Sequence, residues 1–598
     1  MKLSKLYSNH DDLFSPIAFS DGLNVVLAEI KLPENQKKNT HNLGKTTLGQ
    51  VIDFCLLARR HKEMFLFKNP KLFSSFVFFL EIELRPGYYV TVRRAVSEPS
   101  KASFKRHVTR GANLVDLGEE DWDHWRASFD RSRTLLDGML DLAAVKPWDF
   151  RKGLGYLIRS QRDYRDVFQL AHFASAHADW KPYIAHILGF DSSLLKDYYA
   201  AENAVEELRA TEKIVQRELG GSVEDLSKIE GLLLLRQSDV DRQQKLLDSF
   251  DFRDQDRDAT KRLVDEIDEQ ISELNADRYS LGFNRKRLLA SLEADALMFD
   301  VESATRIFTE VGVLFTGQIK KDFNQLVAFN RAITDERNQY LREELGQIDA
   351  SLDEINVRLN ELGAERASSL EFLGDTDVFK KYKTVSDQLI ELRADIVSLT
   401  RQREHIHRLQ QLRGEIRETS ERLTHLGTAW EREVEAANAA DASGLFTTIR
   451  LLFDGIVSSV IDQGALLTVS LNSESHPEFR AEILNSAGTA TSADRGNTYK
   501  KLLCIAFDLA ILRAHQDTGY PEFVFHDGAF ETLDPRTKGK LLAVMRKYSE
   551  IGIQQIVTLI DADVPPENEQ GVTFTDDEVI LRLHDVDESG RLFKMTSW

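Results

Sequence analysis

A loop near the N-terminus carries residue types that bind phosphate groups. The residues Leu43-Gly44-Lys45-Thr46-Thr47 follow an apolar run at 22–30 and precede a helical pattern at 46–59. In such a loop the backbone N–H groups face the phosphates, the lysine adds positive charge and the hydroxyl ligates Mg²⁺. An asparagine stands where the usual pattern has its first glycine, and asparagine tolerates the left-handed conformation better than most residues. We expect the nucleotide contacts to be made by Asn39, Asn42, Gly44, Lys45, Thr46 and Thr47.

A buried strand near the C-terminus ends in an acid. Phe523-Val524-Phe525-His526 precedes Asp527, and Asp534 follows seven residues later. This spacing is similar to ABC-type ATPases, in which the first acid holds Mg²⁺ through water and the second lies between two heads. The glutamate that follows the first acid in that pattern is replaced by Gly528, and Glu531 is the nearest carboxylate. The resemblance therefore assigns catalysis to Lys45, Asp527 and Glu531.

A second alignment of the same strand remains open. It puts His526 at the metal side and makes Asp527 the catalytic acid. The first alignment is favoured because it keeps the spacing to Asp534.

Three other segments fit the same ABC-type pattern by their position. Gly496 and Asn497 precede an apolar helix and stand where a signature loop would touch nucleotide on the other subunit. Gln161 stands where a glutamine would contact the γ-phosphate and Mg²⁺, and Asp561 stands where a switch histidine is usual. The expected cofactors are ATP and Mg²⁺, held on the metal side by Thr46, Asp527 and Gln161. The missing glutamate and histidine together predict unusual or slow hydrolysis.

The elements that position these residues come from two distant parts of the chain. Residues 1–194 and 441–598 have mixed α/β texture, whereas no proline occurs from 183 to 476. Apolar residues between them recur in a 4-3-4-3 spacing, which is the seam of a coiled coil. The clearest series are Leu341, Leu345, Ile348, Leu352, Ile355, Leu359 and Leu362, then Val385, Leu389, Leu392, Ile396 and Leu399, and, less regularly, Val264, Ile267, Ile271, Leu274 and Leu281.

These patterns predict one α/β head with a helical insertion. The head is assembled from an N-terminal half, 1–194, and a C-terminal half, 441–598. A long antiparallel α-helical coiled coil is inserted between them, with an ascending arm at 195–300, a tip at 301–330 and a descending arm at 331–440. Breaks are expected near Gly220-Gly221 and between Gly363 and Gly374.

Composition limits the function classes. No stretch approaches the roughly 18 apolar residues of a membrane span, and the N-terminus lacks the apolar core of a signal peptide, so we expect a cytoplasmic protein without a membrane partner. The two cysteines, Cys55 and Cys504, fit a reducing compartment. The net charge of −20 argues against a uniformly basic surface, so a DNA site must be local. Its candidates are Arg59, Arg60, Lys62, Arg93, Arg94, Lys105 and Arg106.

The order of phosphate loop, coiled coil, signature, acidic strand and second aspartate resembles the SMC, RecN and SbcC group of ABC ATPases. More narrowly, the chain is similar to the bacterial YydD-like family. The segments that carry this likeness are the GKTT loop, GYLIRSQRDY, the tip, FVFHDGAFE and LRLHDVDESGRLFK. The resemblance implies a homodimer with ATP sandwiched between its heads, binding to double-stranded DNA, and control of an effector nuclease in a Lamassu-type or other three-component antiphage system.

Two alternatives remain. One is a structural scaffold whose nucleotide site hydrolyses ATP poorly or not at all, and the other is a DNA repair or recombination ATPase. A transporter subunit is disfavoured because the coiled coil has no counterpart in that class.

Overall fold

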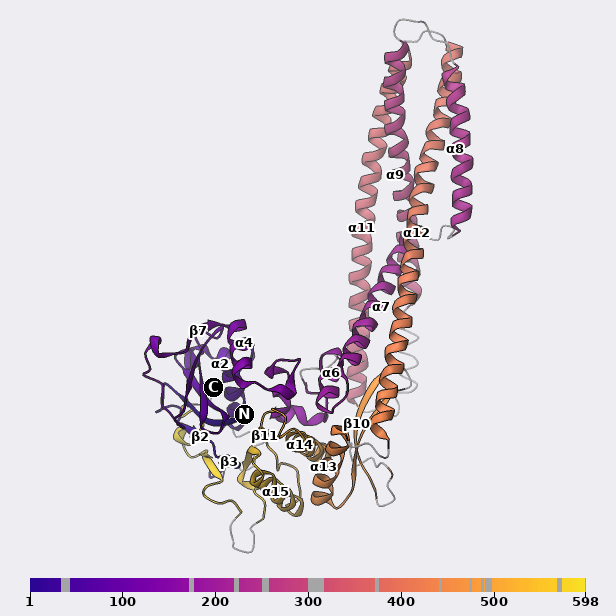
Figure 1. Cartoon of the computed structure of the whole chain (residues 1–598). Helices are drawn as coiled ribbons and strands as arrows, with labels where there is room; N and C mark the ends of the chain where they lie inside the picture. The colour runs from indigo at the N-terminus through magenta and orange to yellow at the C-terminus, as the bar shows by residue number, and fades with distance from the viewer. Residues whose placement is uncertain are drawn as a thin grey trace. The chain divides into compact units, whose positions relative to one another are not determined.

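A computed structural model of the chain shows two compact units. It describes residues 1–33, 43–171, 177–219, 225–249, 257–298, 317–371, 376–439, 444–472, 476–485, 489, 497–566, 573–596 and 598. The head unit comprises Met1–Glu202 and Arg422–Trp598, and the helical unit comprises Asn203–Glu421 (Figure 1). This division confirms the predicted fold class, in which a helical insertion separates two halves of one α/β head.

The first sheet of the head unit comes from the N-terminal half alone. Its six strands have the order β2-β1-β4-β5-β6-β7, and all neighbours are antiparallel. The strands β4 and β5 form the predicted hairpin around Gly87, whose φ of 77° suits a turn. The strand bounds are Lys2–Ser8 for β1, Ile17–Ala18 for β2, Val77–Arg85 for β4, Tyr88–Ala95 for β5, Lys101–His107 for β6 and His124–Ser128 for β7.

The second sheet draws strands from both ends of the chain. Its order is β13-β3-β12-β11-β8, and every neighbouring pair is parallel. The strand β3, from the N-terminal half, lies between two C-terminal strands, so neither half can complete this sheet alone. The bounds are Leu23–Glu29 for β3, Ile158–Arg159 for β8, Phe523–Asp527 for β11, Gln554–Ile560 for β12 and Val579–His584 for β13.

Helix α1 joins the two sheets. It spans Lys45–Cys55, contacts β4 and β5 of the first sheet and β11 and β12 of the second, and buries Leu48, Val51 and Ile52 completely. The strands β3, β11 and β12 are buried along almost their whole length because both faces of a parallel sheet are covered. The other head helices are α2 (Phe65–Lys68), α3 (Pro70–Phe73), α4 (Phe129–Leu140), α5 (Leu154–Leu157), α6 (His177–Ile187), α13 (Leu445–Ile461), α14 (Asn497–Ala514) and α15 (Pro535–Glu550), and β9 (Ala465–Leu471) pairs with β10 (Pro477–Ile483).

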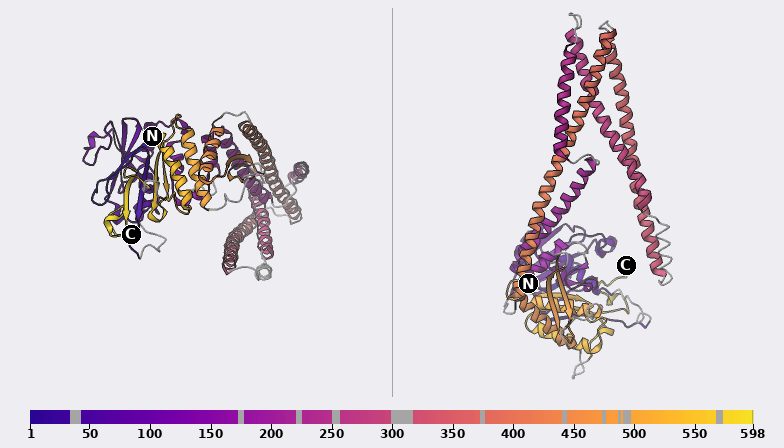
Figure 2. Two further views of the ribbon diagram at one scale, coloured as in Figure 1. Left: turned by 90° about the horizontal axis from the view of Figure 1, so that it is seen from below. Right: turned by 90° about the vertical axis from the view of Figure 1, so that its right-hand side faces the viewer.

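The helical unit is built from long helices that run in both directions. Figures 1 and 2 show these long helices, which splay apart in the right-hand view of Figure 2. The unit boundaries fall inside α7 and α12. Its helices are α7 (Ser192–Leu219), α8 (Leu226–Asp248), α9 (Arg257–Met298), α11 (Gly317–Glu371) and α12 (Thr376–Asn438).

The contacts between the long helices differ from the expected pair of uninterrupted antiparallel arms. Helix α8 runs antiparallel to α12, with Arg236 beside Asp395 and Gln243 beside Gln388. Helix α9 runs parallel to α12 and antiparallel to α11. A single ascending arm at 195–300 is therefore wrong, because α9 runs back along the direction of α8.

Some of the predicted seam residues are buried, and the others are half-buried. Val264, Ile267, Leu362 and Leu389 are buried. The expected break near Gly220-Gly221 lies outside the described residues. Of the expected break from Gly363 to Gly374, residues 363–371 are helical within α11, and 372–374 lie outside the described residues. Of the predicted tip, 301–316 also lies outside them, and α11 begins at Gly317. A heptad spacing reveals that a helix has a partner but not which helix that partner is.

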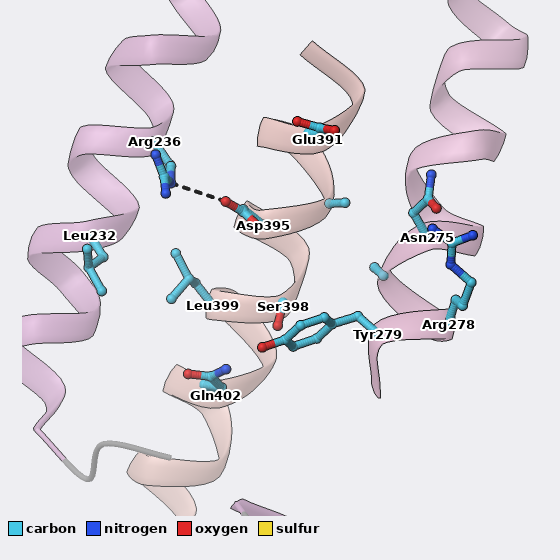
Figure 3. A pocket seen from close by; sticks show the side chains of 12 residues that line it. Leu232, Arg236, Asn275, Arg278, Tyr279, Glu391, Asp395, Ser398, Leu399 and Gln402 are labelled. Carbon is cyan, nitrogen blue, oxygen red and sulfur yellow. Dashed lines mark ion pairs between the residues drawn. The ribbon is translucent and has the colours of Figure 1, made fainter. Parts of the chain in front are cut away.

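Two polar features mark the interior of this unit. Arg366 of α11 is 6% exposed, forms an ion pair with Asp268 of α9 at 2.6 Å, and donates hydrogen bonds to Ser386 and Asp387 of α12 at 2.5 and 2.6 Å. A cavity of about 600 Å³ lies where α8 and α9 flank α12, with the Arg236–Asp395 ion pair (3.2 Å) beside it (Figure 3). The side chains that line it are largely polar.

Candidate functional site

The predicted phosphate loop opens directly into α1. Gly44 is the N-cap of α1 and has a φ of 103°, a conformation that favours glycine. A Cβ atom at this position would also lie 2.5 Å from Cβ of Leu592, so the position requires glycine for two reasons. Lys45, Thr46 and Thr47 form the first turn of α1, where free backbone N–H groups favour anions. Asn39 and Asn42 lie outside the described residues.

The acid of the C-terminal strand meets this turn. The Thr46 hydroxyl donates to Oδ2 of Asp527 at 2.6 Å, and the Thr558 hydroxyl donates to Oδ1 at 2.7 Å. Asp527 is completely buried at the carboxyl end of β11, and Thr558 lies on the neighbouring strand β12. The carboxyl ends of parallel strands are the usual ligand edge of such sheets. A hydroxyl beside a carboxylate is a donor set that suits Mg²⁺.

Glu531 reaches the same place from the turn after β11. Its carboxylate accepts hydrogen bonds from Nε2 of Gln161, which lies 3.0 Å from each oxygen, and lies 3.8 Å from Nζ of Lys45. On the other side it lies 3.7 Å from Nζ of Lys501 on α14. The structure therefore brings together four charged or amide side chains from four separate segments of the chain.

The turn that carries Glu531 depends on Gly528. This glycine has a φ of 67°, and a Cβ atom there would meet the Glu531 carboxylate carbon at 2.6 Å. Lys501 fixes the same turn by donating to the carbonyl oxygen of Gly528 at 2.8 Å. The position directly after Asp527 thus has no room for a side chain while Glu531 occupies its observed place.

Burial shifts the ionisation of both charged partners. Desolvation raises the pKa of Glu531, while the nearby Lys501 and Lys45 charges act in the opposite direction. Desolvation lowers the pKa of Lys501, against the charges of Glu531, Asp563 and Asp527. Shifts of this kind, in a cluster beside a phosphate loop, are typical of functional sites.

A second buried network of charged side chains lies next to the site, on α14, β11 and β8. Asp508 of α14 accepts hydrogen bonds from Nε and Nη2 of Arg159 at 2.8 and 2.7 Å, and Nε2 of His526 lies 3.1 Å from its Oδ2. All three side chains are at most 1% exposed. Because His526 contacts Asp508 while Asp527 contacts Thr46, the geometry supports the alignment with Asp527 on the metal side.

The remaining predicted site residues do not join this cluster. Asp534 is the N-cap of α15 and accepts from the Thr537 N–H at 3.1 Å. Asp561 accepts from the backbone N–H of Ile30 at 2.9 Å and so ties β12 to β3. Gly496 lies outside the described residues, and Asn497 is the first residue of α14.

The basic residues proposed for DNA divide into two groups. Arg94 is 1% exposed and donates to the carbonyl oxygens of Phe54, Ala58 and Pro99, so its prediction as a DNA contact is wrong. Lys105 and Arg106 both pair with Asp123, and Arg93 stacks on the Trp125 ring.

The other three basic residues, Arg59, Arg60 and Lys62, are exposed. Arg59 and Arg60 line a cavity of about 1200 Å³ that also reaches Thr46 and Asp527. They therefore remain the candidates for a polyanion contact.

Sequence reasoning missed four residues of the site, namely Lys501, Thr558, Arg159 and Asp508. A signal was present for Asp508, which is a lone charge in the apolar run from Leu502 to Leu512 of α14. Lys501 lies beside Lys500 at the start of the helix and does not stand out. Thr558 and Arg159 give no local signal, since their role depends on which strands are neighbours in the sheet.

Comparisons with known proteins find a matching family model and a similar curated protein. Residues 456–597 match a family described as an uncharacterised protein conserved in bacteria (DUF2326). The uncharacterised protein YydD of Bacillus subtilis (strain 168) is 16% identical over 87% of this chain and 86% of its own length.

Solved structures with similar chains include three Smc heads. The Smc head domain with coiled coil and joint from Pyrococcus yayanosii is 15% identical, with a TM-score of 0.32 over 94% of this chain and 92% of its own. The Smc head from Pyrococcus furiosus bound to the C-terminal domain of ScpA is 13% identical, with a TM-score of 0.31 over 94% and 90%. A third, the SmcHead bound to the C-winged helix domain of ScpA, is 10% identical, with a TM-score of 0.32 over 94% and 90%.

Among the described residues, no helix is long and apolar enough to cross a membrane.

Proposed function

We propose that the head unit binds ATP with Mg²⁺ and hydrolyses it. The observation that carries this proposal is the contact of Thr46 with Asp527, at 2.6 Å, beside Lys45 on the first turn of α1. Thr46 and Asp527 would hold Mg²⁺ on the phosphates, and the ion would neutralise charge on the oxygens during transfer. Lys45 and the N-terminus of α1 would bind the phosphate oxygens.

Glu531 is the proposed general base. Among the described residues, Glu531 is the carboxylate that contacts both Lys45 and Gln161. Its raised pKa moves it toward the range in which a carboxylate accepts a proton from water. Slow hydrolysis is expected, because Glu531 is offset from the position directly after the metal-side acid.

The test compares nucleotide binding and turnover in matched variants. Lys45→Ala should abolish ATP binding measured by calorimetry, whereas Lys500→Ala, one residue before Lys501 on α14, should leave it unchanged. Glu531→Gln should keep ATP binding and lose turnover. Unimpaired ATP binding by Lys45→Ala would refute the nucleotide site, and full turnover by Glu531→Gln would refute the base.

We further propose that two heads dimerise around two ATP molecules. Support comes from the motif order and from Asp534, which is exposed and free of the Glu531 cluster. ATP-dependent dimerisation, followed by light scattering with Asp534→Ala and Lys45→Ala, tests this step. A mass that stays monomeric with ATP would refute it.

DNA binding and a role in antiphage defence complete the proposal. Exposed Arg59, Arg60 and Lys62 support a local phosphate contact. A partner effector nuclease of a three-component system is implied only by the resemblance to the YydD-like family. Arg59→Ala with Arg60→Ala should weaken duplex binding, whereas Arg106→Ala, already paired with Asp123, should not. Loss of phage protection in cells carrying Lys45→Ala within the native gene cluster tests the defence role.

A scaffold function without turnover is the second candidate. It is favoured by Gly528 and Asp561 at the positions of the usual glutamate and histidine. ATP binding with no measurable hydrolysis in the presence of duplex DNA would decide for it.

A further inference from the structure

The Glu531 carboxylate already occupies the side chains that a terminal phosphate needs. Its two oxygens accept hydrogen bonds from Gln161 at 3.0 Å each, and Oε1 lies 3.8 Å from Nζ of Lys45. Lys45 and Gln161 are the groups assigned above to the phosphates of ATP. The chain therefore supplies its own anion at this position.

The two anions cannot share these partners without repulsion. Asp527 lies beside the same cluster and is completely buried, so negative charge there is already high. A phosphate arriving on Lys45 would place another anion next to a carboxylate in a poorly solvated place, which is unfavourable. Glu531 must then give up Lys45 and Gln161.

A receiving partner stands on the opposite side of the carboxylate. Lys501 is 7% exposed, and its Nζ lies 3.7 Å from Oε2 of Glu531. Hydrogen bonds to the carbonyl oxygens of Gly528 and Glu531, at 2.8 and 3.3 Å, hold the ammonium group in place, and it faces the Tyr164 ring. Lys501 belongs to α14, so it moves with that helix.

We propose that Glu531 is an intramolecular competitor of the γ-phosphate, and that ATP binding transfers its carboxylate from Lys45 and Gln161 to Lys501. This inference rests on the proposed ATP site. The transfer leaves Glu531 paired with α14 alone, so occupation of the site by a triphosphate is passed to the helix that follows the signature segment. ADP, which brings no γ-phosphate, leaves the transfer incomplete.

The test uses the selectivity between triphosphate and diphosphate. The affinities of β,γ-imido-ATP and of ADP are measured by calorimetry with Mg²⁺ on the full chain. The imido compound resists hydrolysis, so trapping by slow turnover does not contribute. Glu531→Gln removes the competing charge and should tighten the imido-ATP affinity by about tenfold more than the ADP affinity. Glu550→Gln, an exposed acid at the end of α15, is the control for net charge and should leave the ratio unchanged.

A second variant tests the receiving partner. Lys501→Met should weaken imido-ATP relative to ADP by about tenfold, because Glu531 then has no other cation to move to. Lys500→Met should not change this ratio. In the Glu531→Gln background, Lys501→Met should have no further effect on the ratio, a result that a purely structural lysine would not give.

Three outcomes are distinct. Equal changes of both affinities in Glu531→Gln would overturn the competitor role. A ratio that Lys501→Met leaves at its wild-type value would overturn the transfer to Lys501. If neither nucleotide binds the wild-type chain, the proposed function fails together with the inference, and the two kinds of failure are separated by the wild-type titration itself.

Discussion

Asp508→Asn should destabilise the head unit while leaving the helical unit intact. The carboxylate of Asp508 is the only charge paired with Arg159 among the described ion pairs, and both side chains are at most 1% exposed. Burial alone would lower the pKa of Arg159, but the Asp508 charge and its hydrogen bonds raise it, so the guanidinium stays charged. The substitution therefore leaves a buried cation without its anion.

The magnitude follows from the partners that remain. Removing one member of a buried ion pair costs about 3–5 kcal/mol. Arg159 keeps hydrogen bonds to the carbonyl oxygens of Asp163, Asp166 and Val167, at 2.9, 3.4 and 3.2 Å. Because these bonds offset part of the loss, we expect the lower end, about 3 kcal/mol.

Tryptophan fluorescence gives the assay. All six tryptophans of the chain lie in the head unit, so guanidinium unfolding followed by fluorescence reports this unit alone. Circular dichroism at 222 nm adds the long helices of the other unit. The fluorescence midpoint should fall in Asp508→Asn, whereas the dichroism should keep a transition at the wild-type midpoint.

The double variant Arg159→Met, Asp508→Leu is the matched control. It removes both charges, so its midpoint should lie nearer to the wild type than that of Asp508→Asn. An unchanged fluorescence midpoint in Asp508→Asn would refute the reasoning. So would a double variant that loses as much stability as the sum of the two single variants, because the charges would then not be coupled.

Three further predictions concern other parts of the chain. Lys45→Ala should leave the unfolding free energy of the nucleotide-free chain, followed by fluorescence, within about 0.5 kcal/mol of the wild type, because Lys45 contributes one long ion pair. ATP should no longer stabilise this variant. Stabilisation by ATP would count against the site. Arg366→Met leaves the buried Asp268 carboxylate without its cation and should lower the unfolding free energy of the helical unit by about 3–5 kcal/mol. The dichroism transition should then move to lower denaturant concentration while the fluorescence midpoint stays unchanged. A shift of both signals together would contradict this prediction. Burial lowers the pKa of His515 below its ordinary 6.5. Just below pH 6.5, therefore, the imidazole takes up a proton in the unfolded state but not in the folded state. The stability that is present above pH 6.5 is lost as the pH falls toward the folded pKa. His515→Gln should flatten the fall of the midpoint between pH 7.5 and pH 5, whereas exposed His61→Gln should keep it; parallel curves for His515→Gln and the wild type would be evidence against the burial argument.

The positions of the predicted nucleotide motifs, at the start of α1 and the end of β11, could be predicted because each pattern is local. A phosphate loop needs a glycine, a lysine and a hydroxyl in consecutive positions, and Gly44, Lys45 and Thr46 occupy the start of α1 as expected. Asp527 could be found because a buried strand that ends in an acid is visible in the sequence. The division into a head and a helical insertion followed from periodicity, which changes at the borders of the two textures.

The parts that could not be predicted depend on distant neighbours. Arg94 and Arg106 look alike in the sequence, yet one is buried among carbonyl oxygens and the other is exposed beside Asp123. The support of Glu531 by Lys501 requires α14 to pass behind the turn at Gly528, which no local pattern encodes. The reversal between α8 and α9 was missed because the same apolar seam suits a partner of either direction.

The position of β3 between β12 and β13 has a consequence for synthesis on the ribosome. Glu29 and Gln554, which end β3 and begin β12, are separated by 525 residues. At a translation rate of about 5–20 residues per second, roughly 25–100 s pass between the synthesis of β3 and that of β12, its first neighbour in the sheet. During that interval the nascent chain exposes an apolar strand with two unpaired edges, and exposed strand edges promote aggregation. We expect this protein to engage chaperones early in translation, and a truncated product that ends within the long helices to be degraded rather than to interfere with intact copies.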